Sequence, residues 1–353
     1  MKKNKILVYG PSNVDPFKEL SEHTGMEPFI YLKHYLQKCG YQIKLFSADE
    51  INDAAWIFFW DIPSTFQSRN CDVMILGPLR TLFSRFTGNI RRSKFEKILN
   101  LCGNADLGNR LALILWEPPA VLPQNYDLNL HSKFKYIFTW NDALVDNKKY
   151  IKFYWPQNGN NPKFLDRSFF ERKLIVNISS NKTSSHPEEL YSEREKFVRY
   201  CEKAIPKEFD LFGHGWDSDS FGSSYPSWKG VVSNKSEVYS NYKFGLVYEN
   251  MKNINGWVSE KIFDCIRCGC VPVYWGAANI ENYVDPKTFI DRRIFKSEQD
   301  LINHLFSISE KEWLKIRKAG IKYLTSDTFD KFMPKNFSSI IFNTLTKNAQ
   351  KNI

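Results

Sequence analysis

A serine, a glutamate and a lysine stand together where a helical apolar pattern begins, at Ser259, Glu260 and Lys261. Ser259 is a residue type that caps helices, and Gly269 suits the helix end. A helix N-terminus presents free N–H groups and partial positive charge, which would stabilise a diphosphate. Lys261 would add to this charge, and Glu260 could accept hydrogen bonds from ribose or sugar hydroxyls. The alternative interpretation is an exposed Glu–Lys pair without a function.

The residues around this helix favour the binding interpretation. The apolar run 244–248 predicts a buried strand that ends in Glu249 and Asn250 and is followed by a flexible, glycine-containing loop. VPVYWG (271–276) predicts a second buried strand after the helix. The helix start is therefore expected at the carboxyl edge of a sheet, where ligands of α/β proteins commonly bind.

The elements that would position these residues alternate between strands and helices. MEPFIYLKHYLQKCG has apolar residues spaced for a helix and ends at Gly40, which suits the position after a helix. This rhythm predicts a largely parallel, doubly wound α/β sheet. In the first half of the chain, strands are expected at residues 5–10, 41–47, 72–77, 111–116 and 136–140.

A turn-rich segment divides the chain. YWPQNGNNPKF (154–164) combines Pro, Asn and Gly, which favours a linker. We expect two Rossmann-like domains at 1–158 and 159–330, facing a ligand cleft, and a basic tail or helix at 331–353. In the second domain, strands are expected at 173–181, 209–215, 244–250 and 271–276, with a helix at 192–203.

Composition limits the class of protein. The chain has 353 residues, 42% of them hydrophobic, which suits packed globular domains. The amino-terminal apolar run is too short for a signal peptide, and no window approaches the ~18 uninterrupted apolar residues of a membrane span. We therefore expect a soluble, cytoplasmic chain.

The segment from residue 244 to residue 290 resembles the donor site of the α1,3/4-fucosyltransferases, a GT-B family that uses GDP-fucose. In that family a strand ending in F-E-N is followed by a loop, by Y-V-T-E-K opening a helix, by a strand of the type I/V-P-V/I-Y-W/Y-G and by P-x-x-F-I. Here these elements read YEN, WVSEK, VPVYWG and PKTFI. The resemblance implies that the following residues contact the donor: Tyr248, Glu249, Asn250, Trp257, Ser259, Glu260 and Lys261.

The resemblance extends upstream of this segment. In the family a strand ending in S-N precedes a helix whose arginine pairs with the donor diphosphate. SSN (179–181) followed by YSEREKFVRYCEK looks like that element. It implies that Asn181 and Arg194 bind the donor, with Arg199 as the weaker counterpart.

The family also uses a glutamate of the amino-terminal domain as the base that takes the proton from the acceptor hydroxyl. LALILWEPPA (111–120) presents Glu117 at a strand end, where Pro118 and Pro119 direct the chain out of the sheet. The resemblance therefore implies that Glu117 is the catalytic base of an inverting glycosyltransferase. A loop carboxylate without a catalytic role is the alternative.

No metal and no other cofactor is expected. Arg194, Lys261 and a helix N-terminus can together offset a diphosphate that other transferases neutralise with a metal ion held by D-x-D. The literal match DSD (217–219) lies in a Gly/Ser-rich loop and favours a solvated turn. Three clustered cysteines lack a visible fourth ligand and favour buried thiols over a zinc site: Cys265, Cys268 and Cys270.

The expected partners are a nucleotide-sugar donor and an oligosaccharide or glycolipid acceptor that receives fucose in an α1,3-type linkage. Trp257 stands where the family has tyrosine, and its loop is one residue longer, so a different nucleotide sugar is the first alternative. The acceptor itself is not readable, because acceptor loops vary freely on such scaffolds. A donor-site relic that only binds nucleotide is a further alternative.

Charge supplies the remaining alternatives. The 49 Lys and Arg residues exceed the 39 Asp and Glu residues, for a net charge of +10, which would suit a polyanion- or nucleic-acid-binding protein without catalysis. No recognisable module supports that class, so no nucleic-acid partner is expected. The basic carboxyl-terminal segment suggests peripheral contact with an anionic membrane.

Overall fold

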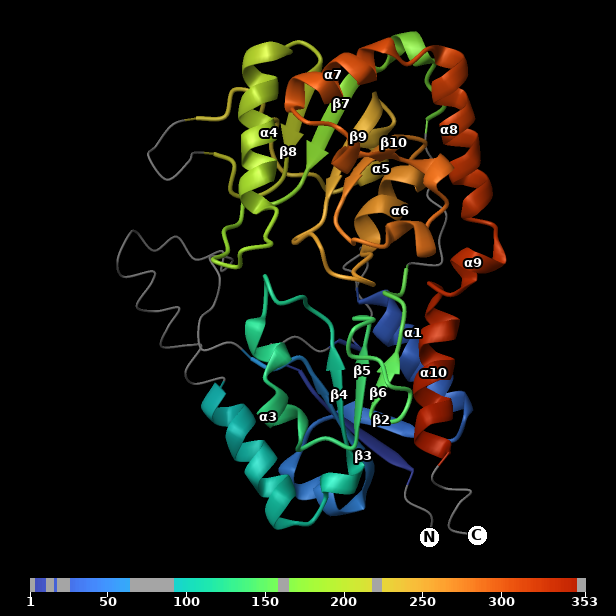
Figure 1. Cartoon of the computed structure of the whole chain (residues 1–353). Helices are drawn as coiled ribbons and strands as arrows, with labels where there is room; N and C mark the ends of the chain where they lie inside the picture. Colours follow the sequence, from blue (N-terminus) through green and yellow to red (C-terminus); the bar gives the residue numbers. More distant parts are fainter. Residues whose placement is uncertain are drawn as a thin grey trace. The chain divides into compact units, whose positions relative to one another are not determined.

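The computed structural model describes residues 4–10, 16–17, 26–63, 92–157, 165–217 and 224–347. The chain forms two compact units (Figure 1). The first contains residues 1–158 together with 332–353, and the second contains residues 159–331. The carboxyl-terminal segment, expected as a separate tail or helix, therefore belongs to the first unit, because its helix packs against that unit's first helix.

The first unit is built on a parallel sheet with the strand order β2-β1-β3-β4-β5-β6 among the described residues. Side chains of a helix at 92–104 pack on one face, and α1 and α10 lie together on the other (Figure 1). The unit also contains η1 (Ala48–Asp53), η2 (Gly108–Arg110), η3 (Pro123–Tyr126), α1 (Glu27–Lys38), α3 (Leu128–His131) and α10 (Pro334–Thr346). Its strands are β1 (Lys5–Tyr9), β2 (Gln42–Leu45), β3 (Ala54–Trp60), β4 (Leu111–Leu115), β5 (Tyr136–Thr139) and β6 (Tyr150–Lys152).

Aromatic side chains join α1 and α10 to this sheet. Phe29 of α1 stacks on Trp60 with ring centroids 3.9 Å apart, and it also meets Trp116 and Phe337. Large buried rings contribute strongly to core stability, since each removes about 150–250 Å² from water. This cluster explains why the carboxyl-terminal helix returns to the first unit.

The second unit is a parallel sheet with the order β11-β10-β9-β7-β8. Its strands are β7 (Lys173–Ile178), β8 (Phe209–Phe212), β9 (Tyr242–Tyr248), β10 (Val271–Trp275) and β11 (Ile290–Asp291). Its α-helices are α4 (Tyr191–Ala204), α5 (Lys235–Tyr239), α6 (Glu260–Arg267), α7 (Glu298–Ser307), α8 (Glu310–Tyr323) and α9 (Asp327–Asp330). Short 3-10 turns are η4 (Phe169–Glu171), η5 (Ile280–Asn282), η6 (Pro286–Thr288) and η7 (Arg292–Ile294).

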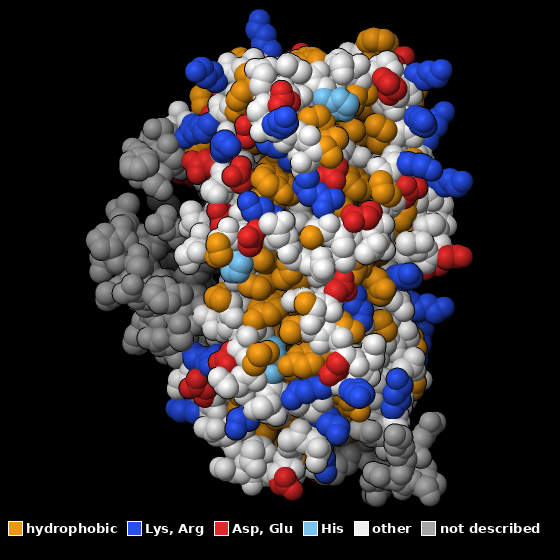
Figure 2. Space-filling view, viewed as in Figure 1, with side chains coloured by type: hydrophobic (Ala, Val, Ile, Leu, Met, Phe, Trp, Pro, Cys, Tyr) orange, Lys and Arg blue, Asp and Glu red, His pale blue; other side chains and the backbone are white. Residues whose placement is uncertain are grey.

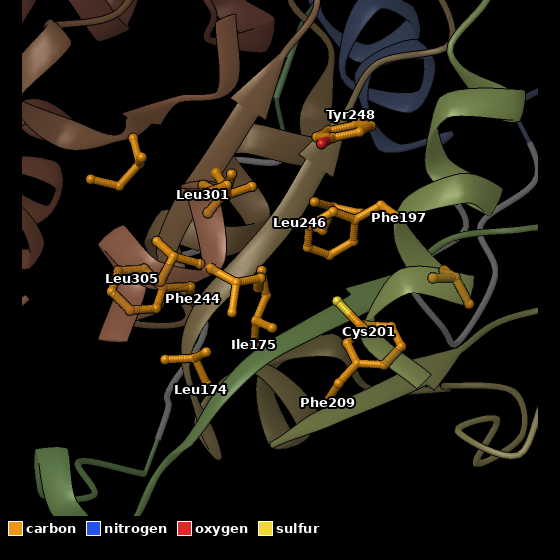
Figure 3. Close-up of a cluster of buried hydrophobic side chains, with 14 of the residues drawn as sticks. Leu174, Ile175, Phe197, Cys201, Phe209, Phe244, Leu246, Tyr248, Leu301 and Leu305 are labelled. Atoms are coloured by element: carbon orange, nitrogen blue, oxygen red, sulfur yellow. The ribbon is translucent and has the colours of Figure 1, made fainter. Parts of the chain in front are cut away.

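The core of the second unit lies where α4 and α7 cover its sheet. Figure 3 shows Phe197 and Cys201 of α4 beside Leu246 and Ile175 of the sheet, with Leu301 of α7 in the same cluster. The chain leaves β7 in opposite directions to β8 and β9, so the strand order reverses at β7. The carboxyl ends of β7 and β9 therefore form the place where ligands bind in sheets of this kind.

The parallel, doubly wound sheets predicted from sequence are confirmed. The predicted strands near residues 5, 42, 111 and 136 and the helices ending before Gly40 and Gly269 are present. The strand expected at 72–77 lies outside the described residues. Two strands of the first sheet were not predicted, β3 and β6. Within the described part of the chain, no helix combines the length and apolar character that crossing a membrane requires.

Candidate functional site

The start of α6 is organised by a buried carboxylate at the end of β9. Ser259 caps the helix, accepting from the backbone N–H of Lys261 at 3.5 Å. Glu249, with 0% of its surface exposed, accepts from the Ser259 backbone N–H at 2.9 Å and from its hydroxyl at 2.7 Å. The two oxygens of Glu249 thus fix both the cap residue and its side chain, so the first turn of α6 has one defined geometry.

Lys261 completes this arrangement. Its Nζ lies 3.2 Å from Glu249 Oε2, 3.0 Å from Ser259 Oγ and 3.7 Å from Glu260 Oε1. Burial alone would lower the pKa of Lys261, but the carboxylates of Glu249 and Glu260 outweigh burial and hold this pKa above its ordinary value. The ammonium group is therefore charged at neutral pH, and 24% of its side chain is exposed. A charged, partly exposed donor at a helix start can bind an anion.

Arg194 approaches the same strand end from α4. It is 3% exposed, and its Nη2 donates to the backbone carbonyl oxygens of Tyr248 at 2.8 Å and Glu249 at 3.2 Å. A guanidinium has five N–H donors, and these two bonds use Nη2 alone. The positive charge of Arg194 is close enough to Lys261 to oppose its protonation. The structure thus brings the two predicted cations together.

Arg199, the weaker counterpart, is committed elsewhere on α4. Its Nη1 donates to the Ser224 carbonyl oxygen at 2.8 Å and pairs with Glu202 at 3.2 Å, and its guanidinium lies over the Tyr225 ring at 3.6 Å. These contacts join α4 to the segment after β8. Arg199 therefore has a structural role on α4, whereas Arg194 lies at the end of β9.

Three other predicted donor-site residues lie at the strand ends or in the core. Asn181 follows β7, where its N–H donates to the His214 carbonyl oxygen at 2.8 Å, and Asn250 follows β9, where its carbonyl accepts from Leu190. Tyr248 is 2% exposed, and its hydroxyl accepts from Arg292 Nε at 3.1 Å. The Tyr248 phenol therefore packs in the core, where its hydrogen bond to Arg292 helps to hold the end of β9 in place.

The loop between β9 and α6, expected to be flexible, is held by hydrogen bonds. Asn253 has a positive φ of 59°, and its side chain donates to Glu188 at 2.7 Å. The Gly256 N–H donates to the Asn279 side chain at 3.0 Å. Trp257 is 1% exposed, so its ring is packed in the interior of the second unit. The extra residue of this loop is accommodated by defined contacts.

Two supporting residues of this site were not predicted. A Cβ on Gly276 would lie 2.4 Å from Glu249 Cγ, so only glycine leaves room for the Glu249 side chain. Arg292 holds the Tyr248 hydroxyl from the turn after β11. Gly276 ends the motif VPVYWG. A glycine at the end of a buried strand is a sequence signal for close approach of another group, here the Glu249 side chain.

Glu117 lies in the first unit, two residues after the end of β4. It is half-buried, and its backbone N–H donates to Asp61 Oδ1 at 3.2 Å. Asp61, at the end of β3, is 3% exposed and has a positive φ of 57°. Burial, reinforced by the neighbouring Glu117 carboxylate, raises the pKa of Asp61 to about 8. Sequence reasoning missed Asp61 because β3 itself was not predicted.

Two further sequence features concern metal binding, the three clustered cysteines and the DSD match. Cys265, Cys268 and Cys270 are buried free thiols, as predicted. Asp217 is described, whereas residues 218 and 219 of the DSD match lie outside the described residues. Where the structure describes the chain, no three His, Cys, Asp or Glu residues are grouped so that they could hold a metal ion.

Solved structures share this architecture. An α1,3-fucosyltransferase solved with GDP-fucose aligns with 97% of this chain and 90% of its own, with a TM-score of 0.52 and 15% identity. An Anabaena protein, HepE, solved with UDP and glucose, aligns with 97% of this chain and 99% of its own, with a TM-score of 0.56 and 10% identity. The fold is that of the GT-B glycosyltransferases.

Sequence comparisons match part of the second unit to a known family domain. Residues 171–316 match the model of the glycosyltransferase family 10 (fucosyltransferase) carboxyl-terminal domain. An α-(1,3)-fucosyltransferase of Helicobacter pylori is 36% identical over 74 residues, which are 21% of this chain and 15% of that protein. An α-(1,4)-fucosyltransferase of Arabidopsis thaliana is 42% identical over 62 residues, 18% of this chain and 15% of that protein. The predicted resemblance to the fucosyltransferase family is confirmed through this domain.

Proposed function

We propose that this chain is an inverting glycosyltransferase that transfers L-fucose from GDP-fucose to a hydroxyl group of a glycan. One observation carries the proposal. Arg194, near the start of α4, and Lys261, at the start of α6, both lie at the carboxyl end of β9. Two cations beside a helix N-terminus suit a diphosphate leaving group. The family domain lies over these same elements.

In the proposed reaction the acceptor oxygen attacks the anomeric carbon of fucose while the bond from that carbon to the diphosphate oxygen breaks. Glu117 takes the hydroxyl proton, and GDP leaves with the electron pair of the broken bond. Arg194 and Lys261 stabilise the negative charge that grows on the diphosphate. The product is an α-linked fucoside, which we propose to be of the α1,3 type.

We also propose that the reaction needs no metal ion. The charge of Lys261, maintained by Glu249, and the guanidinium of Arg194 supply the positive charge that a divalent ion supplies in other transferases. Activity in excess EDTA equal to activity in Mg²⁺ or Mn²⁺ would support this proposal. Loss of activity in EDTA with recovery on adding a divalent ion would refute it.

A donor panel tests the identity of the sugar. The protein is incubated with GDP-fucose, GDP-mannose, UDP-glucose and UDP-N-acetylglucosamine, and mass spectrometry follows nucleotide release without acceptor and then with an array of oligosaccharides and glycolipids. We expect release of GDP from GDP-fucose that increases with one group of acceptors. Preference for another nucleotide sugar would replace the donor and keep the reaction type.

The face of the molecule shown in Figure 2 does not favour the polyanion-binding alternative. On the face shown in Figure 2, Lys and Arg side chains are dispersed over both units and interspersed with Asp and Glu. A nucleic-acid-binding surface is typically a continuous basic patch or stripe.

A further inference from the structure

A set of buried side chains holds the backbone that carries Glu117. Asp61 Oδ1 accepts three hydrogen bonds, from the backbone N–H of Trp116 at 2.6 Å, the backbone N–H of Glu117 at 3.2 Å and the side-chain amide of Asn125 at 2.6 Å. The same strand end would otherwise present these N–H groups to water or to a neighbouring strand. A carboxyl oxygen from β3 therefore sets the direction in which the chain leaves β4.

The carbonyl groups of the same two residues are held as well. Trp140 Nε1 donates to the Trp116 carbonyl oxygen at 3.1 Å. The Glu117 carbonyl oxygen accepts from Asn125 Nδ2 at 3.2 Å and from the Tyr126 hydroxyl at 3.3 Å. Both residues thus have their N–H and their carbonyl fixed by side chains, and Pro118 follows at once. Such a backbone fixes the position of the Glu117 Cα and the direction of its Cα–Cβ bond.

Asp61 itself combines two unfavourable features. Its φ of 57° is in the left-handed region, which L-residues other than glycine avoid, although Asp and Asn tolerate it best. Its carboxyl group is buried, and the donors that reach it are neutral amides. Strained backbone and buried polar groups persist where surrounding structure demands them, and they concentrate at functional sites.

We propose that Asp61 is a positioning residue that fixes the Glu117 carboxylate for proton abstraction, an inference that rests on the proposed role of Glu117 as base. The clamp, defined as Asp61, Asn125, Tyr126 and Trp140, acts through the backbone of Trp116 and Glu117. Pre-set geometry matters because a displacement of about 1 Å at a reacting group lowers rates by about 10²-fold.

The protonation state of Asp61 suits this task. With a pKa raised to about 8, mainly by burial and next by Glu117, the carboxyl group is largely neutral at pH 7. A neutral Asp61 does not repel the Glu117 carboxylate, and its carbonyl oxygen can still accept the three hydrogen bonds. Tyr126 interacts electrostatically with Asp61 and Glu117, and burial raises its pKa. His131 hydrogen-bonds the Asn125 carbonyl oxygen, and burial lowers its pKa.

Two substitutions at Asp61 distinguish the effect of its hydrogen-bond acceptor from the effect of its positive-φ backbone. Asp61→Asn keeps both the carbonyl acceptor and a residue type that tolerates positive φ, and it resembles the neutral acid. Asp61→Gly keeps the φ but removes the acceptor. We expect kcat of Asp61→Asn within about threefold of the parent and kcat of Asp61→Gly lower by about 10²-fold, with the donor KM of both unchanged within about twofold.

A milder variant protects the test against misfolding. Tyr126→Phe removes only the hydroxyl that donates to the Glu117 carbonyl, and we expect a kcat about three- to tenfold lower with an unchanged donor KM. Calorimetric GDP binding and the thermal midpoint check that each variant is folded. Equal kcat for Asp61→Gly, Tyr126→Phe and the parent would refute the clamp.

The double variant Glu117→Gln/Asp61→Gly distinguishes the two proposals. If Asp61 acts through Glu117, the double variant should be no slower than Glu117→Gln alone, whereas an independent structural role would lower kcat further. Full activity of Glu117→Gln would remove Glu117 as base and leave the donor site unaffected. Asp61→Asn as slow as Asp61→Gly would show that the ionisable carboxyl group of Asp61, and not its acceptor oxygen alone, is needed, which would overturn the positioning role.

Discussion

The two units place a buried carboxylate at equivalent positions, directly after a central strand, and give it opposite surroundings. Glu249 follows β9 and meets the ammonium group of Lys261 at 3.2 Å. Asp61 follows β3 and meets neutral N–H donors and a second carboxylate, Glu117. A buried charge is tolerated when a counter-charge compensates it, and otherwise the group becomes neutral. The carboxyl edge of a sheet can therefore carry a charged Lys261–Glu249 pair in one unit and a carboxyl group with a raised pKa in the other.

This contrast divides the kinetic consequences between the units. From the proposed roles, we expect changes near Glu249 to alter how the donor diphosphate is held, and changes near Asp61 to alter how the acceptor proton is removed. The first should affect the donor KM together with kcat, and the second should affect kcat alone. Substitutions in each unit can test this division.

Glu117→Gln gives the largest expected effect. The amide keeps the size of the side chain but cannot take a proton, so we expect kcat to fall by about 10²–10⁴-fold. The donor KM should stay within about twofold of the parent, measured by GDP release under initial-rate conditions. Glu96→Gln, a substitution at an exposed glutamate of the same unit, is the control. A raised donor KM with unchanged kcat would contradict the division.

Lys261→Ala should have the next largest effect. Removing a fixed cation from the diphosphate site should lower kcat/KM by about 10²–10³-fold and raise the donor KM, because charge stabilisation is lost in both the ground state and the transition state. Lys229→Ala, at a half-exposed lysine of the same unit, should match the parent. Isothermal calorimetry with GDP measures the ground-state part separately. Unchanged GDP affinity would contradict a role in holding the diphosphate.

Gly276→Ala tests whether the position of Glu249 matters. The new Cβ would lie 2.4 Å from Glu249 Cγ, so the carboxylate must move away from Ser259 and Lys261. We expect the free energy of unfolding to fall by about 1–3 kcal/mol and the donor KM to rise. Gly103→Ala, where an added Cβ meets nothing within 4 Å, is the matched control. Denaturant unfolding and GDP-release kinetics measure the two effects.

The pH dependence of stability should report Asp61. Because its folded-state pKa is raised to about 8 from an ordinary 3.8, the folded state binds more protons than the unfolded state between these values. The free energy of unfolding should therefore fall as pH rises from about 4 to 8, by at most about 1.4 kcal/mol per pH unit from this group. The slope should be smaller in Asp61→Asn, measured by urea unfolding at each pH. Identical slopes in the two proteins would contradict a raised pKa.

Sequence patterns that act over a few residues predicted the local structure of the donor side. Ser259 was predicted to cap α6, and Gly269, with a φ of 68°, ends it. Gly40, with a φ of 86°, likewise follows α1. Caps and apolar spacing are local, since each involves atoms within one or two helical turns.

The missed strand β3 shows where local patterns fail. Its sequence AAWIFFW is a continuous apolar run without alternation, because a central strand of a parallel sheet is buried on both faces. Such a run does not by itself distinguish a strand from a buried helix segment. With β3 unpredicted, the chemical environment of Asp61 at its end could not be anticipated.

The family resemblance, the alternation of strands and helices, and the cap that places Lys261 at a helix start could all be read from the sequence. The contacts between distant groups became visible only in the folded chain: Arg194 with the carbonyl of Tyr248, the Glu249 side chain packed against Gly276, and Asp61 with the backbone of Glu117. Caps and periodicity depend on neighbouring residues, whereas these contacts depend on the order of the strands, which is a property of the whole sheet.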